Sequence, residues 1–369
     1  MALSDQVRPA STGAGRAVAA RPAPRRGPRV RAAARHEART GWLFVTPAVV
    51  LTLVFIVAPV LMALWVSMLH WDGQSSPFGG GGTFVGAGNY ADLLAQDGLL
   101  RQDFSTSLRN TLYYVALDVP LVTVLSFGLA LAVNQRLLGG TGFFRTVFYF
   151  PSITSSVAIG VTFLFLFSGN GAVNAVLAIV GLHGPRWFTD SRGLVQVVLI
   201  GTGLVDPAHL PGWLGTRVLS LDLWSWLAGP SVAMVAIITL TVWSTSGTFM
   251  LFFLAGLQNI PADVEEAASV DGATSWQRFR LVTLPLMRRT VVLVVTLALI
   301  GSWQVFDQVY VMSQGSPGKT TLTPAFLSYQ RSFGDGSFGP GAAIAFVLFA
   351  IIVVFTAIQR WIGREREAT

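Results

Sequence analysis

Three polar side chains, Gln304, Asp307 and Gln308, lie within one long apolar segment of this sequence. Their spacing puts them on one face of a helix, and Trp303 and Tyr310 fall on an adjacent stripe. Amides and a carboxylate can hydrogen-bond hydroxyl groups, while an aromatic ring can cover the apolar face of a sugar. The set therefore suits a path for a carbohydrate. In the alternative interpretation, Asp307 and the two glutamines only bond to a neighbouring helix.

Residue types that serve in catalysis are missing or badly placed. The chain has no cysteine, which excludes thiol nucleophiles, disulfides and cysteine-bound metals. A serine nucleophile in the segment Ser244–Gly247 would need a histidine inside the membrane as its base. The histidines lie outside the long apolar segments, and none are paired at metal-ligand spacing: His36, His70, His183 and His209. We expect no catalytic residue and no metal site.

The segment Gly315–Thr320 resembles a phosphate-binding loop and holds Lys319, the only lysine in the chain. That loop type requires a glycine five residues before Gly318, where this sequence has Ser313. We expect no nucleotide or other cofactor in this chain. Energy for any transport must then come from a partner or from an ion gradient.

The elements that position these residues are long apolar segments. Of 369 residues, 52% are hydrophobic and 12% charged, against roughly 25% charged in soluble domains, which excludes a soluble enzyme. The pattern predicts an all-α protein of the plasma membrane with six spans. Another apolar stretch, 193–205, is too short to span and is predicted to lie at the surface. The expected spans cover about residues 42–69, 110–135, 146–168, 227–257, 290–312 and 341–359.

Charge sets the expected orientation. With both termini cytoplasmic, 18 of the 25 Lys and Arg residues fall on the cytoplasmic side, as short inner loops require. The net charge of +7 thus reflects topology and not a nucleic-acid partner. Residues 1–40 hold nine Arg and two acids among many Ala and Pro, and are predicted to be a disordered tail beside anionic lipid. Residues 41–363 form the membrane domain, and 364–369 are a second cytoplasmic tail.

The cytoplasmic segment 259–285 is more than a simple turn. Pro261 suits a first helical position, and acidic residues follow it at the positive end of the helix dipole. Gly272 is a natural stop. A second helix should open near Thr274 or Ser275 and run to Leu284-Pro285. We predict two short helices forming a hairpin on the cytoplasmic surface.

This segment resembles the signature of permease subunits of binding-protein-dependent ABC importers. That signature is Glu-Ala-Ala, three residues, Gly, nine residues, Ile, one residue and Leu-Pro. Here Glu266-Ala267-Ala268, Gly272 and Leu284-Pro285 match, and Val282 replaces the isoleucine. Further segments across roughly residues 41–363 resemble the sugar-type branch, similar to maltose and glycerol-phosphate permeases: Phe84–Gly86 with Asn89-Tyr90, Asn110–Leu112, Phe143–Arg145 with Pro151, and Phe306–Met312.

The resemblance implies a type I importer permease fold and a set of partners. This chain would lie in the membrane lipid beside a second, similar permease. Its other partners would be two ATPase subunits, which carry ATP and Mg²⁺, and an extracellular solute-binding protein. The solute would be a disaccharide, an oligosaccharide or a glycerol-phosphate-like compound. The short acidic helix would fit a groove on an ATPase subunit. The expected coupling residues are Asp263, Glu265, Glu266, Ala267, Ala268, Asp271, Gly272, Leu284 and Pro285.

Several alternatives stay open at this point. An ion-coupled secondary transporter would need buried ionisable residues, for which Asp118 and Asp307 are the candidates. Each of these two lines the solute path or bonds to a neighbouring helix. Ser244–Gly247 either allows close helix packing or lines a cavity. About 30 extra external residues, 193–222, form an insertion of undetermined role.

Overall fold

The computed structural model describes residues 28–134, 140–182, 184–204 and 211–365. The tail residues 1–27, Arg136 and residues 366–369 lie outside these ranges. The chain divides into two compact units, Met1–Val60 and Leu61–Thr369, which are described separately.

The first unit, in its described part, is one helix. α1 (Pro28–Thr52) continues through a π-helical turn, η1 (Leu53–Val57), into α2 (Ala58–Ser67). Residues 28–39 belong to this helix although the sequence predicts a disordered tail there; their Ala- and Arg-rich composition favours a helix. The apolar stretch Thr40–Ser67 is 28 residues long, and only 6% of its most apolar window is buried.

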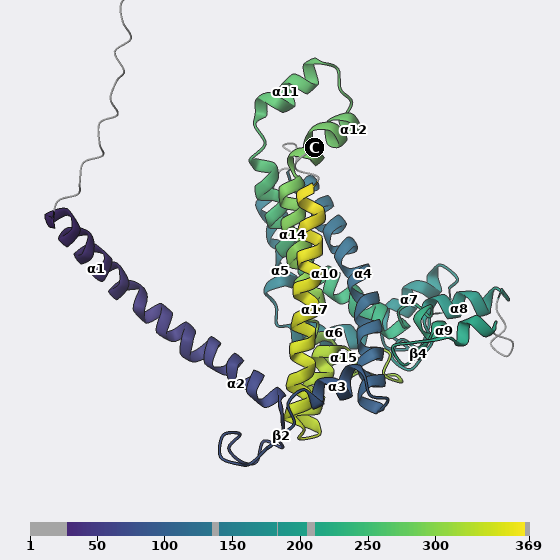
Figure 1. Ribbon diagram of the computed structural model, residues 1–369. Coiled ribbons are helices and arrows are strands. Elements are labelled where there is room, and N and C mark those ends of the chain that lie inside the picture. The colour runs from purple at the N-terminus through teal and green to yellow at the C-terminus, as the bar shows by residue number, and fades with distance from the viewer. Residues whose placement is uncertain (1–27, 135–139, 183, 205–210, 366–369) are drawn as a thin grey trace, which may run out of the picture. The chain divides into compact units, whose positions relative to one another are not determined.

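The second unit is organised around α10 (Val232–Gln258), the most buried of the long helices. α10 packs against α4 (Leu99–Val133), α5 (Thr141–Ile153) and α14 (Arg288–Trp303). α17 (Phe338–Glu365) completes the bundle by packing against α14 (Figure 1). Large apolar side chains fill much of the core: Ile237, Leu240 and Phe253 of α10 are fully buried or nearly so.

Two expected spans are bent rather than continuous. α5 and α6 (Ser156–Leu166) meet at 94°, so the predicted helix over 146–168 is interrupted next to Pro151. The expected fifth span ends early, because α14 stops at Trp303 and α15 (Asp307–Met312) begins after a break. Among the described residues, four helices are long and apolar enough to cross a membrane. The number rises to six if each bent pair is one span, the pairs being α5 with α6 and Ser275–Leu286 with α14.

Short elements close the end of the bundle at which α4 begins. The stretch 193–205, predicted to be too short to span, contains α8, which has eight residues. The remaining elements here are β1 (Leu69–His70) paired with β2 (Thr83–Phe84), α3 (Gly88–Leu94), α7 (Ala172–Ile179), α8 (Leu194–Gly201), η2 (Gly212–Gly215), β3 (Arg217–Val218) paired with β4 (Leu221–Asp222), α9 (Leu223–Trp226), α16 (Pro324–Tyr329) and η4 (Gln330–Gly334).

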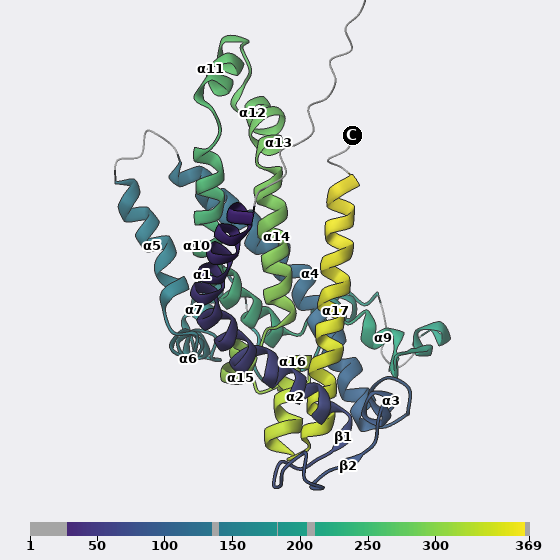
Figure 2. The same ribbon diagram turned by 60° about the vertical axis from the view of Figure 1, so that its left-hand side comes forward.

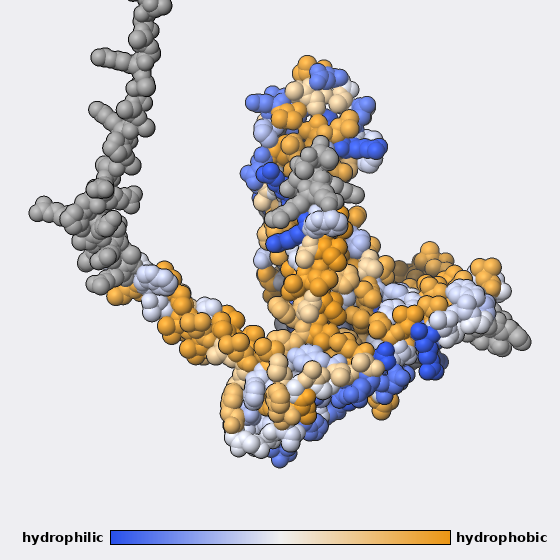
Figure 3. Space-filling model, in the orientation of Figure 1, coloured by the Kyte–Doolittle hydropathy of each residue, from blue (hydrophilic) through white to orange (hydrophobic). Residues whose placement is uncertain are grey.

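At the opposite end, a helical hairpin projects beyond α10 and α14 (Figure 2). It consists of α11 (Ala262–Val270), α12 (Ser275–Arg278), a π-helical stretch η3 (Phe279–Thr283) and α13 (Leu284–Leu286). Hydrophilic side chains gather on this projection, with apolar ones among them, while the helices next to it present an apolar surface (Figure 3).

Candidate functional site

The first candidate site is the hairpin formed by α11, α12, η3 and α13. Pro261 caps α11 rather than starting it, and Asp263 and Glu265 lie in the first turn, where negative charge favours the helix dipole. Gly272 has φ +76°, and the amide of Ala273 donates to the carbonyl of Ala268 at 3.0 Å. This is the hydrogen bond of a glycine-terminated helix. Local charges thus favour the start of the short α11, and a local hydrogen bond closes its end.

The second half of the hairpin is also locally capped. The backbone amide of Gln277 donates to the Thr274 hydroxyl at 3.3 Å. In return, the backbone amide of Thr274 donates to the side-chain oxygen of Gln277 at 2.8 Å. Arg278 then links the two halves, because its guanidinium donates to the hydroxyl of Ser269 at 3.0 Å. A ring stack, Trp276 on Phe279 with centroids 5.5 Å apart, adds packing. The hydrogen bonds that shape the hairpin are thus local, while Phe279 also contacts Phe127 of α4, with ring centroids 5.9 Å apart.

The outer surface of the hairpin is open. α11 has no buried residue. Val264 is 40% exposed, Val270 87% and Trp276 65%. Exposed apolar groups beside a run of acids are typical of a contact surface for another protein. The expected coupling residues Glu266 and Ala267 lie on this open helix, whereas Ala268 lines a 380 Å³ cavity with Glu265 and Arg278.

The remaining expected coupling residues lie at the ends of these elements. Asp271 is the C-cap of α11, followed by Gly272. A Cβ on Gly272 would meet nothing within 4 Å, so the glycine is needed for its backbone conformation and not for space. Leu284 and Pro285 belong to α13, after which the chain bends by 66° into α14.

The second candidate site is a cavity of 240 Å³ between α5, α6, α10 and α15. Hydroxyl groups make up much of its lining, together with the amide of Gln308. The cavity is lined by Pro151, Ser152, Thr154, Ser156, Ile159, Leu240, Ser244, Thr245, Thr248, Phe249 and Gln308. Such groups can exchange hydrogen bonds with a hydroxylated solute.

Close packing of α5 on α10 positions this cavity. A Cβ on Gly247 would lie 2.2 Å from the carbonyl oxygen of Phe148, so only glycine allows the two backbones to meet there. Beside that contact, Ser152 donates to the carbonyl of Ser244 at 2.6 Å. Gly247 thus serves packing, whereas Ser244 and Thr245 of the same segment line the cavity.

The residues predicted to form a solute path separate into two groups. Asp307 and Gln308 belong to α15: the Asp307 carboxylate accepts from the Ser156 hydroxyl at 3.0 Å, and Gln308 lines the cavity. Gln304 lies in the break before α15, so it does not share a helical face with them.

The two aromatic residues also separate. Trp303 has no exposed surface, and its ring packs on Phe355 with centroids 5.0 Å apart; it belongs to the bundle core. Tyr310 is 41% exposed and stacks on Phe306. Tyr310 is thus the exposed member of this pair, although it lies outside the set of residues that line the cavity.

Sequence reasoning missed the hydroxyls of Ser152, Thr154 and Ser156. A signal was available, since several hydroxyl residues directly follow Pro151 within an apolar segment. Backbone interrupted at membrane depth is tolerated where it lines a cavity or is buried in protein.

Asp118 was predicted either to line the solute path or to bond to a neighbouring helix, and in the structure it bonds to a neighbouring helix. Its carboxylate is buried and accepts from the hydroxyl of Ser302 at 2.7 Å, which joins α4 to α14. It lies outside the set of residues that line the cavity.

The loop with Gly315–Thr320 is held by α4. Lys319 donates to the carboxylate of Asp103 at 2.5 Å, and Arg331 donates to its second oxygen at 2.9 Å. The Asn110 side chain donates to the backbone carbonyls of Lys319 and Leu322. The single lysine therefore serves as a structural partner.

No group of three His, Asp or Glu side chains with metal-binding geometry occurs among the described residues. Outside the membrane-spanning segments, the Arg192 guanidinium, which donates to Asp190 at 2.7 Å, lowers the pKa of that carboxyl.

Comparisons with known proteins identify the family. Residues 123–367 match the family described as binding-protein-dependent transport system inner membrane component. The lactose transport system permease protein LacF of Rhizobium radiobacter is 30% identical over 336 residues, 90% of this chain and 97% of LacF. The trehalose/maltose transport system permease protein MalF of Thermococcus litoralis is 31% identical over 333 residues, 90% of this chain and 96% of MalF.

The fold has a solved counterpart. A chain in the crystal structure of a bacterial ABC transporter involved in the import of the acidic polysaccharide alginate superposes with a TM-score of 0.66. The two sequences are 18% identical, and the match covers 89% of this chain and 98% of that chain.

Proposed function

This chain belongs to the family of binding-protein-dependent transport system inner membrane components, and on that premise we propose that it carries a saccharide through an ATP-driven importer. It is a multi-pass protein of the bacterial inner membrane, a transport component rather than an enzyme, with the type I ABC importer permease fold. The sequence-based family assignment is confirmed.

The single observation that carries the coupling part of this proposal is the exposed α11. It presents Glu266-Ala267-Ala268 on a stiff projection at the end of two membrane helices. A separate ATPase subunit would grip this helix, with Glu266 meeting a cation or backbone donors. The small side chains of Ala267 and Ala268 would allow close approach.

The chain path supports a mechanical link from hairpin to cavity. α10 ends at Gln258, and three residues separate it from α11. α10 also contributes Ser244, Thr245 and Thr248 to the cavity. A displacement of α11 would therefore act on a helix that bounds the solute cavity. Closure of the ATPase pair would rock this chain against a second, similar permease and open the path alternately to each side.

The saccharide is supported by the cavity lining and by the relatives. Hydroxyls and one amide face the cavity, and the names of two relatives specify lactose, and trehalose or maltose. We propose a disaccharide or oligosaccharide delivered by an extracellular binding protein, with both termini of this chain in the cytoplasm. ATP and Mg²⁺ would reside in the ATPase partner.

Energy coupling is tested by solute uptake into proteoliposomes that contain this chain with its partner subunits. We expect uptake of a labelled saccharide to require ATP hydrolysis and the binding protein, and to be unaffected by ionophores. Uptake that persists without any nucleotide-hydrolysing subunit and collapses with an ion gradient would overturn the proposal in favour of ion-coupled transport.

The solute path is tested at Asp307. Removing this carboxylate in Asp307→Ala should lower uptake about tenfold or more, the usual cost of losing a hydrogen bond to a charged group. The control is Asp92→Ala, because Asp92 is an exposed acid on α3, away from the cavity. Normal uptake by Asp307→Ala with intact assembly would remove Asp307 from the path.

A further inference from the structure

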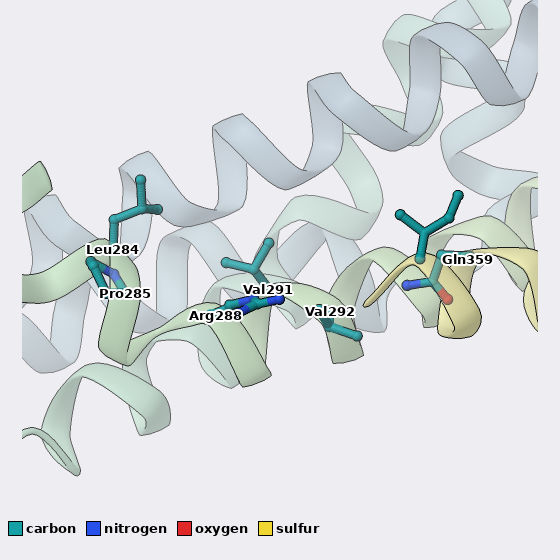
Figure 4. Close-up of a pocket in the computed structure, with 7 residues that line it drawn as sticks. Leu284, Pro285, Arg288, Val291, Val292 and Gln359 are labelled. Atoms are coloured by element: carbon teal, nitrogen blue, oxygen red, sulfur yellow. The ribbon is translucent and has the colours of Figure 1, made fainter. Parts of the chain in front are cut away.

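Two short helices beside the bundle, α7 and α8, expose an apolar surface. Each has eight residues, about 12 Å of helix, so neither can cross a hydrocarbon core of roughly 30 Å. On longer helices an apolar surface is expected in a membrane protein. The 530 Å³ groove between α14 and α17, lined by Val291, Val292 and Ile362 among others, is such a case (Figure 4). The apolar surface of α7 and α8 requires a different explanation.

The exposed side chains of the two helices are aliphatic. Ile179 is 86% exposed and Val198 is 59% exposed. Further exposed aliphatic residues on these helices and in the turns that follow them are Val176, Val180, Leu182, Leu194, Val195 and Leu204. Residues 146–185 and 193–205 contain no Lys, Arg, Asp or Glu. An uncharged apolar surface of this kind indicates contact with lipid or with another protein.

The backbone at the ends of both helices is paired, as contact with lipid requires. Each helix is followed by a glycine with positive φ, Gly181 at +77° and Gly203 at +70°. After α8, the amide of Leu204 donates back to the carbonyl of Leu199 at 3.1 Å, and α7 ends with the same pattern of bonds. This is the Schellman ending, which occupies carbonyl groups at the end of a helix. Unpaired carbonyl groups would be costly in lipid.

Contacts with the bundle place α8 at the membrane boundary. The amide of Leu194 donates to the carbonyl of Pro230, directly before α10, at 2.9 Å. In the same connection, the carbonyl of Ser225 accepts from the guanidinium of Arg109 on α4 at 3.2 Å. Arg109 is the last basic residue of α4, and such residues are typical of the end of an apolar span. α8 is therefore attached where the apolar part of α4 begins.

The arrangement of apolar and hydrophilic side chains has a direction. α7, α8 and α9 project sideways from the bundle rather than beyond its end (Figure 1). Apolar side chains gather along the upper side of this projection, toward the hairpin end of the bundle, and the most hydrophilic ones along its lower edge (Figure 3). Residues 187–226 also hold four of the 11 tryptophans of the chain, a residue type that concentrates where a bilayer meets water.

We propose that α7 and α8 lie in the bilayer interface at the end of the bundle opposite the hairpin, with Ile179 and Val198 among the lipid acyl chains. The charges between the two helices, Arg186 and the ion pair of Arg192 with Asp190 at 2.7 Å, remain at the headgroups. Because the helices themselves are uncharged, burial of apolar surface holds them and anionic lipid is not required. α8 then fastens the external insertion to the membrane. The inference depends only on the membrane location of the chain.

The test measures the depth of spin labels on the full chain, reconstituted with its accompanying subunits in liposomes. Because the chain has no cysteine, Ile179→Cys and Val198→Cys each carry a single label. Relaxation by oxygen, which concentrates in lipid, is compared with relaxation by a water-soluble nickel complex. Both labels should lie about 5–10 Å into the boundary between headgroups and acyl chains. The matched control is Val218→Cys on β3, which is 44% exposed and should meet the nickel complex.

Three results would overturn the proposal. Equal access of the nickel complex to the labels at Val198 and Val218 would place α8 in water. Labels at Ile179 and Val198 that neither reagent reaches would show contact with another protein subunit. The depth should also be the same in phosphatidylcholine alone and with phosphatidylglycerol added; loss of depth in the neutral lipid would assign the attachment to the arginines instead. None of these results depends on transport, so the importer assignment stands or fails separately.

Discussion

The hairpin α11–α13 and the cavity beside α10 are both polar features of an apolar protein, but they are built in opposite ways. In the hairpin, the side-chain hydrogen bonds join residues no more than nine positions apart, such as Arg278 with Ser269. At the cavity, Ser152 bonds Ser244 across 92 positions and Ser156 bonds Asp307 across 151. A surface used by another protein can be locally encoded, whereas a solute cavity depends on how several helices meet.

The largest effect is expected from reversing charge on the hairpin. In Glu266→Lys, uptake should fall about a hundredfold, since like charges at an interface cost several kcal/mol. Insertion into the membrane should be unchanged because α11 has no buried residue. Asp92→Lys, also at an exposed acid, serves as the control for charge alone. Normal uptake and normal ATPase association in Glu266→Lys would contradict the assignment of the hairpin as a contact surface for another protein.

A smaller effect, on the stability of the whole protein, is expected beside the cavity, where α5 packs against α10. Gly247→Ala places a methyl group against the backbone of α5 and should destabilise the protein by about 1–3 kcal/mol. Gly128→Ala on α4 is the matched control, since a Cβ there meets nothing within 4 Å. Thermal unfolding in detergent measures both. Equal unfolding temperatures would contradict the close contact between α5 and α10.

The smallest effect is expected from strain confined to the hairpin. Gly272→Ala forces an L-residue into a left-handed conformation at a cost of about 1 kcal/mol. The amide of Ala273 should then exchange its hydrogen about fivefold faster, while the global unfolding temperature stays unchanged. Gly301→Ala, in open space on α14, should leave that exchange rate unaltered. A global loss of stability would mean that the hairpin is not locally built.

This contrast also explains what the sequence could predict. Capping residues such as Thr274 and the stop at Gly272 act within a few positions, so the hairpin was predictable from its own sequence. Long apolar runs likewise predicted the spans of α4, α10 and α17, because burial in lipid depends on composition and length.

The cavity could not be predicted, for a physical reason. Gln304 was placed on a helical face with Asp307 because spacing assumes an unbroken helix, and the break between α14 and α15 removes that relation. The fully buried Trp303 shows the same limit: an aromatic residue that suits a sugar also suits a helix interface. Which use prevails depends on the position of α17, far along the chain.

The central claim is that α11 is the surface gripped by a separate ATPase subunit. A spin label on Val264→Cys, unique because the chain has no native cysteine, reports its mobility by electron paramagnetic resonance. We predict that adding the ATPase subunits immobilises this label, while a label on Val218→Cys in the β3–β4 hairpin stays mobile. An unchanged spectrum at Val264, in a preparation that still transports its solute, would contradict the account.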